Sequence, residues 1–195
     1  MRCPAREIVL LSLCVLFWGC QDDPEAASEP APTETVESSE ILPQPFTAEQ
    51  IRDEWVPEFQ LKMLRRSGES EELERWTVVE ADDLGAKIEF ASIDEEGQIV
   101  GEARTERTLW TDLRDHASFP ASQSNREQVT RDTDLGTLEG WLYTVDDPDA
   151  GTVTEFFFAS DLPGAPVEMR IRADEVVVME LRQIARSRPE PPPVS

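Results

Sequence analysis

Residues 137–160 read "TLEGWLYTVDDPDAGTVTEFFFAS", two runs rich in β-branched and aromatic residues on either side of "DDPDAG". Asp, Pro and Gly supply the backbone geometry of a turn, and a short connection favours antiparallel pairing of the two strands. In the second run, Phe156 and Phe158 point to one side of the strand and Phe157 to the other, so both faces need apolar cover. The stretch therefore predicts a hairpin whose second strand is either a central core strand or the wall of a ligand cavity.

Much of the remaining chain repeats this pattern of strand-like runs and turns. Turn clusters such as "DDLG" and "DEEG" separate the runs, and residues 55–63 alternate apolar and polar side chains, as a half-buried strand does. The pattern predicts a mainly β domain of about eight or nine antiparallel strands. The other runs are "RWTVVEA", "AKIEFASI", "QIVGEA", "RTERTLWT", "EQVTRDT", "VEMRIRA" and "EVVVMELRQI".

The folded domain is expected to begin with a short helix. In "FTAEQI", the Thr47 side chain can accept from the amide of Gln50 while the Gln50 side chain returns to Thr47, and Phe46 can pack on Ile51. These signals predict a helix from about Ala48 to Glu54, which Pro57 follows. The domain then spans 46–186, with one long irregular connection at 112–128 that is either a loop or a short helix.

The segments on both sides of this domain have a different composition. Residues 20–45 are rich in Pro, Glu, Ser, Ala and Thr and contain no aromatic residue, and residues 187–195 read "SRPEPPPVS". Such segments bury too little apolar surface to offset the entropy lost on ordering. We therefore expect a disordered acidic tether at 20–45 and a disordered Pro-rich tail at 187–195.

The net charge excludes one class of partner. The chain has a formal charge of −23, and its acidic residues are spread from Asp22 to Glu190. This field repels phosphate backbones, so we expect no nucleic-acid binding. The three cysteines, Cys3, Cys14 and Cys20, all lie in the first 20 residues, so the domain has to fold without a disulfide.

The first 20 residues have the order of an export signal. Arg2 and Arg6 precede a mostly apolar run from Ile8 to Trp18, which is far shorter than the roughly 20 residues of a spanning helix. The run ends at Gly19 and Cys20. Taken alone, these residues fit either a lipid-attachment signal or a plain secretory signal with an incidental cysteine.

Residues 1–20 resemble the signal peptide of bacterial lipoproteins. The resemblance implies that residues 1–19 are removed by cleavage after Gly19, that Cys20 carries a thioether lipid and that the new amino terminus is acylated. In that family's sorting logic, Gln21 after the cysteine implies export to the outer membrane. The expected membrane partner is therefore reached through the N-terminal lipid anchor, since several acyl chains together give stable anchoring.

A weaker resemblance covers residues 136–182. "GTLEGWLYTV", "TEFFFASDLPGAPVEMRI" and "VVVMEL" are similar to the last strands of uncharacterised secreted bacterial β-proteins. It implies a curved antiparallel sheet or half-barrel facing a short helix, as in lipoprotein-carrier domains, and it implies no chemistry.

Few residues point to catalysis or to a metal. His116 is the single histidine, with Asp112, Asp115 and Ser118 close in sequence, but no GxSxG motif surrounds a serine. Asp147, Asp149 and Gly151 faintly resemble the start of a calcium loop without its later ligands, and a hairpin turn explains them more simply. We expect no cofactor and no metal, and a domain that is not an enzyme.

Two hypotheses for function remain open, with a hydrolase centred on His116 as a distant third. In the first, the domain is a binding module whose apolar concave face holds a lipid, another apolar ligand or a protein. Its candidate ligand-facing residues are Trp110, Trp141, Phe156 and Phe158. In the second, it is a structural or scaffolding envelope lipoprotein whose acidic exterior meets a basic protein partner.

Overall fold

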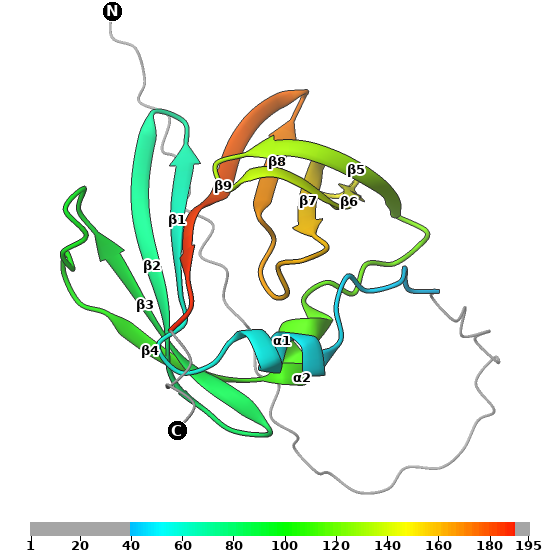
Figure 1. Cartoon of the computed structure of the whole chain (residues 1–195). Coiled ribbons are helices and arrows are strands. Elements are labelled where there is room, and N and C mark those ends of the chain that lie inside the picture. The colour runs from blue at the N-terminus through cyan, green and yellow to red at the C-terminus, as the bar shows by residue number, and fades with distance from the viewer. Residues whose placement is uncertain (1–39, 190–195) are drawn as a thin grey trace, which may run out of the picture. The chain divides into compact units, whose positions relative to one another are not determined.

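The computed structural model describes residues 40–189, so the expected signal peptide, Cys20, most of the tether and the end of the tail lie outside the described residues. Within 40–189 the chain forms two helices and nine strands (Figure 1). In chain order they are α1 (Ala48–Glu54), β1 (Gln60–Ser67), β2 (Ser70–Ala81), β3 (Gly85–Ile93), β4 (Arg104–Leu109), α2 (Trp110–Asp115), β5 (Ser124–Thr133), β6 (Gly136–Asp147), β7 (Thr152–Ala159), β8 (Glu168–Ala173) and β9 (Val176–Ser187).

All nine strands belong to one curved sheet. Their order is β4-β3-β2-β1-β9-β8-β7-β6-β5, and every neighbouring pair is antiparallel. Consecutive strands are hairpin neighbours except where β9, the last strand, pairs with β1, the first. The sheet does not close, because β4 and β5 form its two edges. This confirms the predicted fold class, a mainly β fold with a curved antiparallel sheet or half-barrel of about eight or nine strands and a short N-terminal helix.

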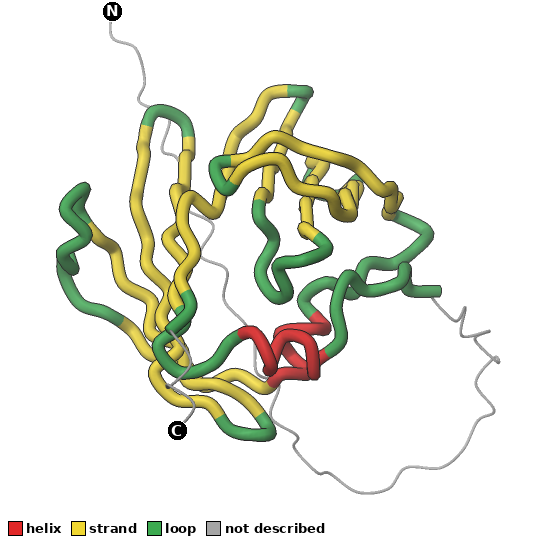
Figure 2. Tube along the Cα trace, in the orientation of Figure 1, coloured by secondary structure: helices red, strands yellow, loops and turns green. Residues whose placement is uncertain are grey.

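The two helices pack side by side against the concave face of the sheet (Figure 2). α1 has the predicted bounds and capping box: Thr47 Oγ1 accepts from Gln50 N at 3.1 Å, and Thr47 N donates to Gln50 Oε1 at 2.8 Å. Phe46 and Ile51, on either side of the cap, are both buried in the core. Of the irregular connection expected at 112–128, only the start is helical, as the end of α2; residues 116–123 form a loop and β5 begins at Ser124.

Three stretches differ from the sequence-based expectation. Residues 98–103 form no strand, since only Ile99 bridges to Ile93 and Gly101 has a φ of +81°, outside the extended region. Trp110 starts α2 rather than ending a strand, because its indole Nε1 donates to Asp82 O at 2.8 Å. The alternation at 55–63 enters the sheet only at Gln60, after a turn that follows α1.

The ordered domain extends past both expected boundaries. Leu42 N donates to Phe119 O at 2.9 Å, and the Tyr143 hydroxyl donates to Pro43 O, so residues 41–44 lie against the 117–120 segment. At the other end β9 runs to Ser187, and Arg188 Nη2 donates to Asp53 O at 3.1 Å. Backbone and aromatic contacts thus order residues whose composition alone predicts disorder.

The sheet has apolar cover on both faces at β7, as the sequence predicts. On the concave side Phe158 meets Phe46 with ring centroids 6.3 Å apart, within the main core. On the convex side Phe157 is fully buried with Leu142, Ala159 and Val167, next to Leu135 and Leu138. Leu135 and Leu138 lie at the tip of the β5–β6 hairpin, so this tip folds back over the outer face of the sheet.

Candidate functional site

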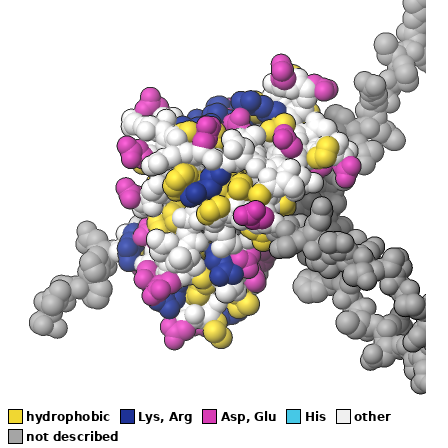
Figure 3. Space-filling model, turned by 90° about the vertical axis from the view of Figure 1, so that its right-hand side faces the viewer, with side chains coloured by type: hydrophobic (Ala, Val, Ile, Leu, Met, Phe, Trp, Pro, Cys, Tyr) yellow, Lys and Arg dark blue, Asp and Glu magenta, His cyan; other side chains and the backbone are white. Residues whose placement is uncertain are grey.

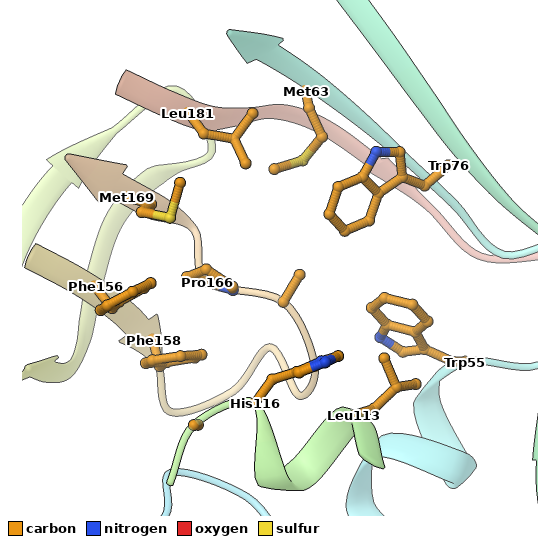
Figure 4. A pocket seen from close by; sticks show the side chains of 13 residues that line it. Trp55, Met63, Trp76, Leu113, His116, Phe156, Phe158, Pro166, Met169 and Leu181 are labelled. Carbon is orange, nitrogen blue, oxygen red and sulfur yellow. The ribbon is translucent and has the colours of Figure 1, made fainter. Parts of the chain in front are cut away.

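A cavity of about 220 Å³ lies between the concave face of the sheet and the helices (Figure 4). Strands β1, β2, β7, β8 and β9, α2 and the residue that follows α1 all contribute to its wall, as does the β7–β8 loop. The lining residues are Trp55, Met63, Trp76, Leu113, His116, Ala117, Phe156, Phe158, Gly164, Ala165, Pro166, Met169 and Leu181. All except His116 are apolar side chains or glycine.

Strand alternation places these apolar residues on one face. Met169 stands between Glu168 and Arg170 on β8, and Leu181 between Glu180 and Arg182 on β9. Because neighbouring side chains of a strand point to opposite faces, the apolar residue enters the cavity and its charged neighbours face outward. The same rule separates Phe156 and Phe158, whose rings stack 6.4 Å apart, from Phe157.

The two indoles of the cavity wall keep their polar atoms satisfied. Trp55 Nε1 donates to Pro163 O at 3.0 Å, and Trp76 Nε1 donates to Glu74 Oε2 at 3.2 Å. Because these N–H groups already have protein partners, the rings offer the cavity mainly apolar surface. A ligand there would gain from apolar burial rather than from hydrogen bonds to the tryptophans.

His116 is the exception in both polarity and exposure. It follows α2 directly and is the one exposed residue among the 13 that line the cavity, so it marks where the cavity meets solvent. Figure 4 shows it on the helix side of the pocket, with its ring extending from the end of α2 toward the side where Trp55 lies. Within residues 40–189 its imidazole makes no hydrogen bond.

The polar groups next to His116 are engaged elsewhere. Gln44 Nε2 donates to Ser118 Oγ at 2.6 Å and to Asp115 Oδ1 at 3.1 Å, and Arg114 Nε donates to Asp115 Oδ1 at 2.7 Å. The hydrogen bond from Arg114, followed by that from Gln44, lowers the pKa of the Asp115 carboxyl below its usual value. The structure therefore does not join Asp115, His116 and Ser118 into a hydrogen-bonded nucleophile and base.

The four candidate ligand-facing residues are split by the fold. Phe156 and Phe158 line the cavity. Trp110 is buried beneath the β2–β3 turn, and Trp141 is half-buried beside Phe158, with the Arg126 guanidinium 3.4 Å from its ring centroid. Neither Trp110 nor Trp141 is a lining residue.

The sequence analysis did not identify most of the residues that line the cavity. Trp55, Met63, Trp76, Met169 and Leu181 were not among the candidates, although each is an apolar residue in a strand-like alternation or next to the helix. The alternation along each strand could have shown which of its residues share the apolar face. It could not have shown that the apolar faces of different strands meet at one cavity.

The described residues hold no group of three His, Cys, Asp or Glu side chains that could bind a metal ion. Asp147 Oδ1 accepts from the amides of Asp149 and Ala150 at 3.1 and 3.0 Å, which is the geometry of a turn cap. No helix within 40–189 has the length and hydropathy needed to cross a bilayer.

No protein-family model and no curated protein matches this sequence. Solved structures do match the fold. The crystal structure of MucB gives a TM-score of 0.51 at 11% identity, over 70% of this chain and 55% of that chain. The crystal structure of MucB in complex with MucA(peri) gives 0.50 at 13% identity, over 75% and 54%. The hypothetical protein CT021 from Chlamydia trachomatis gives 0.39 at 9% identity, over 75% and 98%. This chain spans about half the length of the MucB chains, and at 11–13% identity the likeness to those chains shows the fold alone.

Proposed function

We propose that residues 40–189 form a non-catalytic binding domain that holds one apolar chain in the cavity between the sheet and the helices. The observation that carries this proposal is the cavity itself, whose wall is apolar except at His116. Preformed, mostly apolar concavities with few polar groups are the usual form of small-molecule sites.

The size of the cavity limits its occupant. A cavity of about 150 Å³ suffices for a benzene-sized molecule, and drug-sized ligands usually occupy roughly 300–1,000 Å³. With about 220 Å³ available, one acyl chain or one large apolar side chain fits better than a lipid with two chains.

We also propose that the domain is exported and anchored by a lipid on Cys20. The order of charged, apolar and small residues before Cys20 supports this proposal. The Pro-, Glu- and Ser-rich composition of residues 20–45 is also that of a flexible tether between an anchor and a domain. Intact mass of the mature protein should show acyl mass on a chain that begins at Cys20. Unchanged membrane partition of Cys20→Ser would overturn the anchor without affecting the cavity.

The ligand proposal can be tested by native mass spectrometry. Every contact described above lies within 40–189, so a chain of residues 21–195, secreted into a bacterial periplasm and purified without detergent, retains the whole core. We expect a fraction of it to carry one apolar ligand. Leu181→Phe narrows the cavity from β9 and should abolish the bound mass. Leu138→Phe, the same change on the outer face, should leave it unchanged.

A ligand-free spectrum alone would not overturn the proposal, because the periplasm can contain too little of the ligand to fill the cavity. The native mass measurement is therefore combined with a titration of the protein with 1-decanol. Failure of decanol to bind at its solubility limit, in a folded protein, would overturn the apolar-ligand function.

A protein partner is the second candidate. The likeness to a MucB chain solved in complex with MucA(peri) supports it, as do three exposed valines at the start of β9, Val176, Val177 and Val178. On the face drawn in Figure 3, acidic side chains are interspersed with basic ones, and the overall charge favours a basic partner. A photo-crosslinking residue at Val177 should capture one defined envelope protein in intact cells. The same residue at Glu95, on another hairpin, should not.

A further inference from the structure

His116 gives the apolar cavity one polar contact, at its mouth. The Trp55 and Trp76 N–H groups are both bonded to protein oxygens, so they are not available to a ligand. The His116 imidazole, in contrast, has no partner within residues 40–189 and is exposed to solvent. A ligand whose tail fills the cavity would leave its head group at this ring.

We infer that His116 binds the anionic head group of a single-chain amphiphile whose tail occupies the cavity. The inference rests on the proposed apolar-ligand function and adds the chemical class of the ligand. It names a head group with carboxylate, sulfate or phosphate oxygens, since an imidazole N–H donates to such oxygens and an imidazolium donates more strongly.

The acidic groups near the cavity are already engaged by protein partners. The charge of Asp115 reaches His116, and the Asp115 carboxylate is bound by Arg114 and Gln44. Among the other lining residues, Trp55, Phe158 and the Gly164–Pro166 loop have no titrating side chain. On β2, the Glu74 carboxylate accepts from the indole of the lining Trp76. The positive charge of Arg114 on α2 is paired with Asp115 at 2.7 Å.

The charge of the whole molecule acts against binding of an anionic head group. A formal charge of −23 attracts cations and repels anions at long range. At about 0.15 M salt this field is screened beyond roughly 8 Å, so contacts at the mouth decide the preference. A preference for an anionic head group would therefore reveal a specific local contact.

Three decyl probes separate tail from head group: decyl sulfate, 1-decanol and decyltrimethylammonium, each below its micelle concentration. Sulfate and trimethylammonium keep their charge at every working pH, so the charge of each probe is fixed. We expect calorimetry at pH 5.5 and 0.15 M salt to give roughly tenfold tighter binding of decyl sulfate than of decanol to residues 21–195. The cationic probe should bind more weakly than decanol.

The advantage of decyl sulfate over decanol should vanish in His116→Gln, so that the two probes bind this variant about equally. Lys62→Gln removes one positive charge from the opposite face of β1 and should change nothing.

The outcomes separate the two proposals. Equal binding of all three probes, with no effect of His116→Gln, would overturn the role of His116 and leave the apolar cavity standing. Failure of every probe to bind a folded protein would overturn both. Preference for the cationic probe would show that the global field, and not His116, selects the head group.

Discussion

Gly164 stands at the tightest contact in the cavity wall. Its φ is +117°, and a Cβ built there would lie 2.3 Å from Trp55 Nε1 and 2.5 Å from Trp55 Cε2. Trp55 cannot move aside, because it is buried and its indole is hydrogen bonded to the neighbouring Pro163 O. Only glycine fits both the backbone conformation and the space.

Gly164→Ala should therefore lower the free energy of unfolding by about 2–4 kcal/mol, measured by urea denaturation. Gly136→Ala is the matched control, since Gly136 has a similar φ of +106° with no atom within 4 Å of the built Cβ. Gly136→Ala should therefore lower the free energy of unfolding only by the cost of the backbone strain. Equal losses in the two variants would show that contact with Trp55 contributes nothing.

Tyr143 offers a prediction on pH. It is the single tyrosine and fully buried, and burial raises the pKa of its hydroxyl above 10.0, although the charge and hydrogen bond of Arg126 oppose the shift. The folded state therefore holds this proton longer than the unfolded state. Its contribution to stability is complete below about pH 10 and is lost as pH rises through the folded-state pKa.

Absorbance of tyrosinate near 295 nm reports this group alone. The titration midpoint should lie above that of the same protein in concentrated urea. Tyr143→Phe keeps the ring but should remove the rise of absorbance at high pH. It should also remove the hydrogen bond to Pro43 O, which helps to keep residues 41–44 against the domain. Identical midpoints with and without urea would contradict the burial argument.

At the scale of elements, the β5–β6 hairpin is held to the outer face by charge as well as by apolar contact. Arg131 Nη1 lies 3.2 Å from Glu168 Oε2, and its guanidinium faces the Phe157 ring at 5.7 Å. Near the hairpin tip, Asp134 Oδ2 forms an ion pair with Arg182 Nη1 on β9 at 2.9 Å. The Glu168 side chain is only 8% exposed, so this pair is shielded from solvent.

Arg131→Met should cost about 1–3 kcal/mol in the free energy of unfolding, because it leaves a buried carboxylate with fewer partners. Glu168→Gln in the same chain should recover part of the loss, giving a coupling energy of about 1 kcal/mol or more in a double-mutant cycle. Arg104→Met breaks an exposed pair with Glu106 and should stay within about 0.5 kcal/mol. Additive effects of the first two changes would show that the pair is not coupled.

The elements that the sequence predicts well carry local signals. The capping box at Thr47 and Gln50 places α1, and the Phe156–Phe158 alternation predicts that β7 is covered on both faces. The expected strand at 98–103 fails because β-branched residues there do not outweigh the left-handed Gly101. The start of α2 depends on the bond from Trp110 to Asp82, 28 residues away, and no local pattern encodes it.

At the scale of the whole molecule, the cavity exists because β1 and β9 pair. This contact brings Met63, near the start of the domain, beside Leu181, near its end. Two of the four candidate residues reach the cavity because the aromatic run of β7 faces it. The other walls come from residues whose convergence depends on sheet curvature and on the strand order, which a single sequence does not fix.

The same topology predicts a gradient of stability across the sheet. β1 and β9 have ladder partners on both sides and bury Leu61, Met63 and Gln183, whereas β4 pairs on one side only and is exposed along nearly its whole length. Hydrogen exchange followed by mass spectrometry should therefore find the slowest amides in β1 and β9 and much faster exchange in β4, since opening an edge strand exposes little apolar surface. Protection in β4 equal to that in β1 would mean that another strand covers this edge in solution. Dilution would then distinguish a second copy of the chain from an intramolecular cover, because only the former loses protection as the concentration falls.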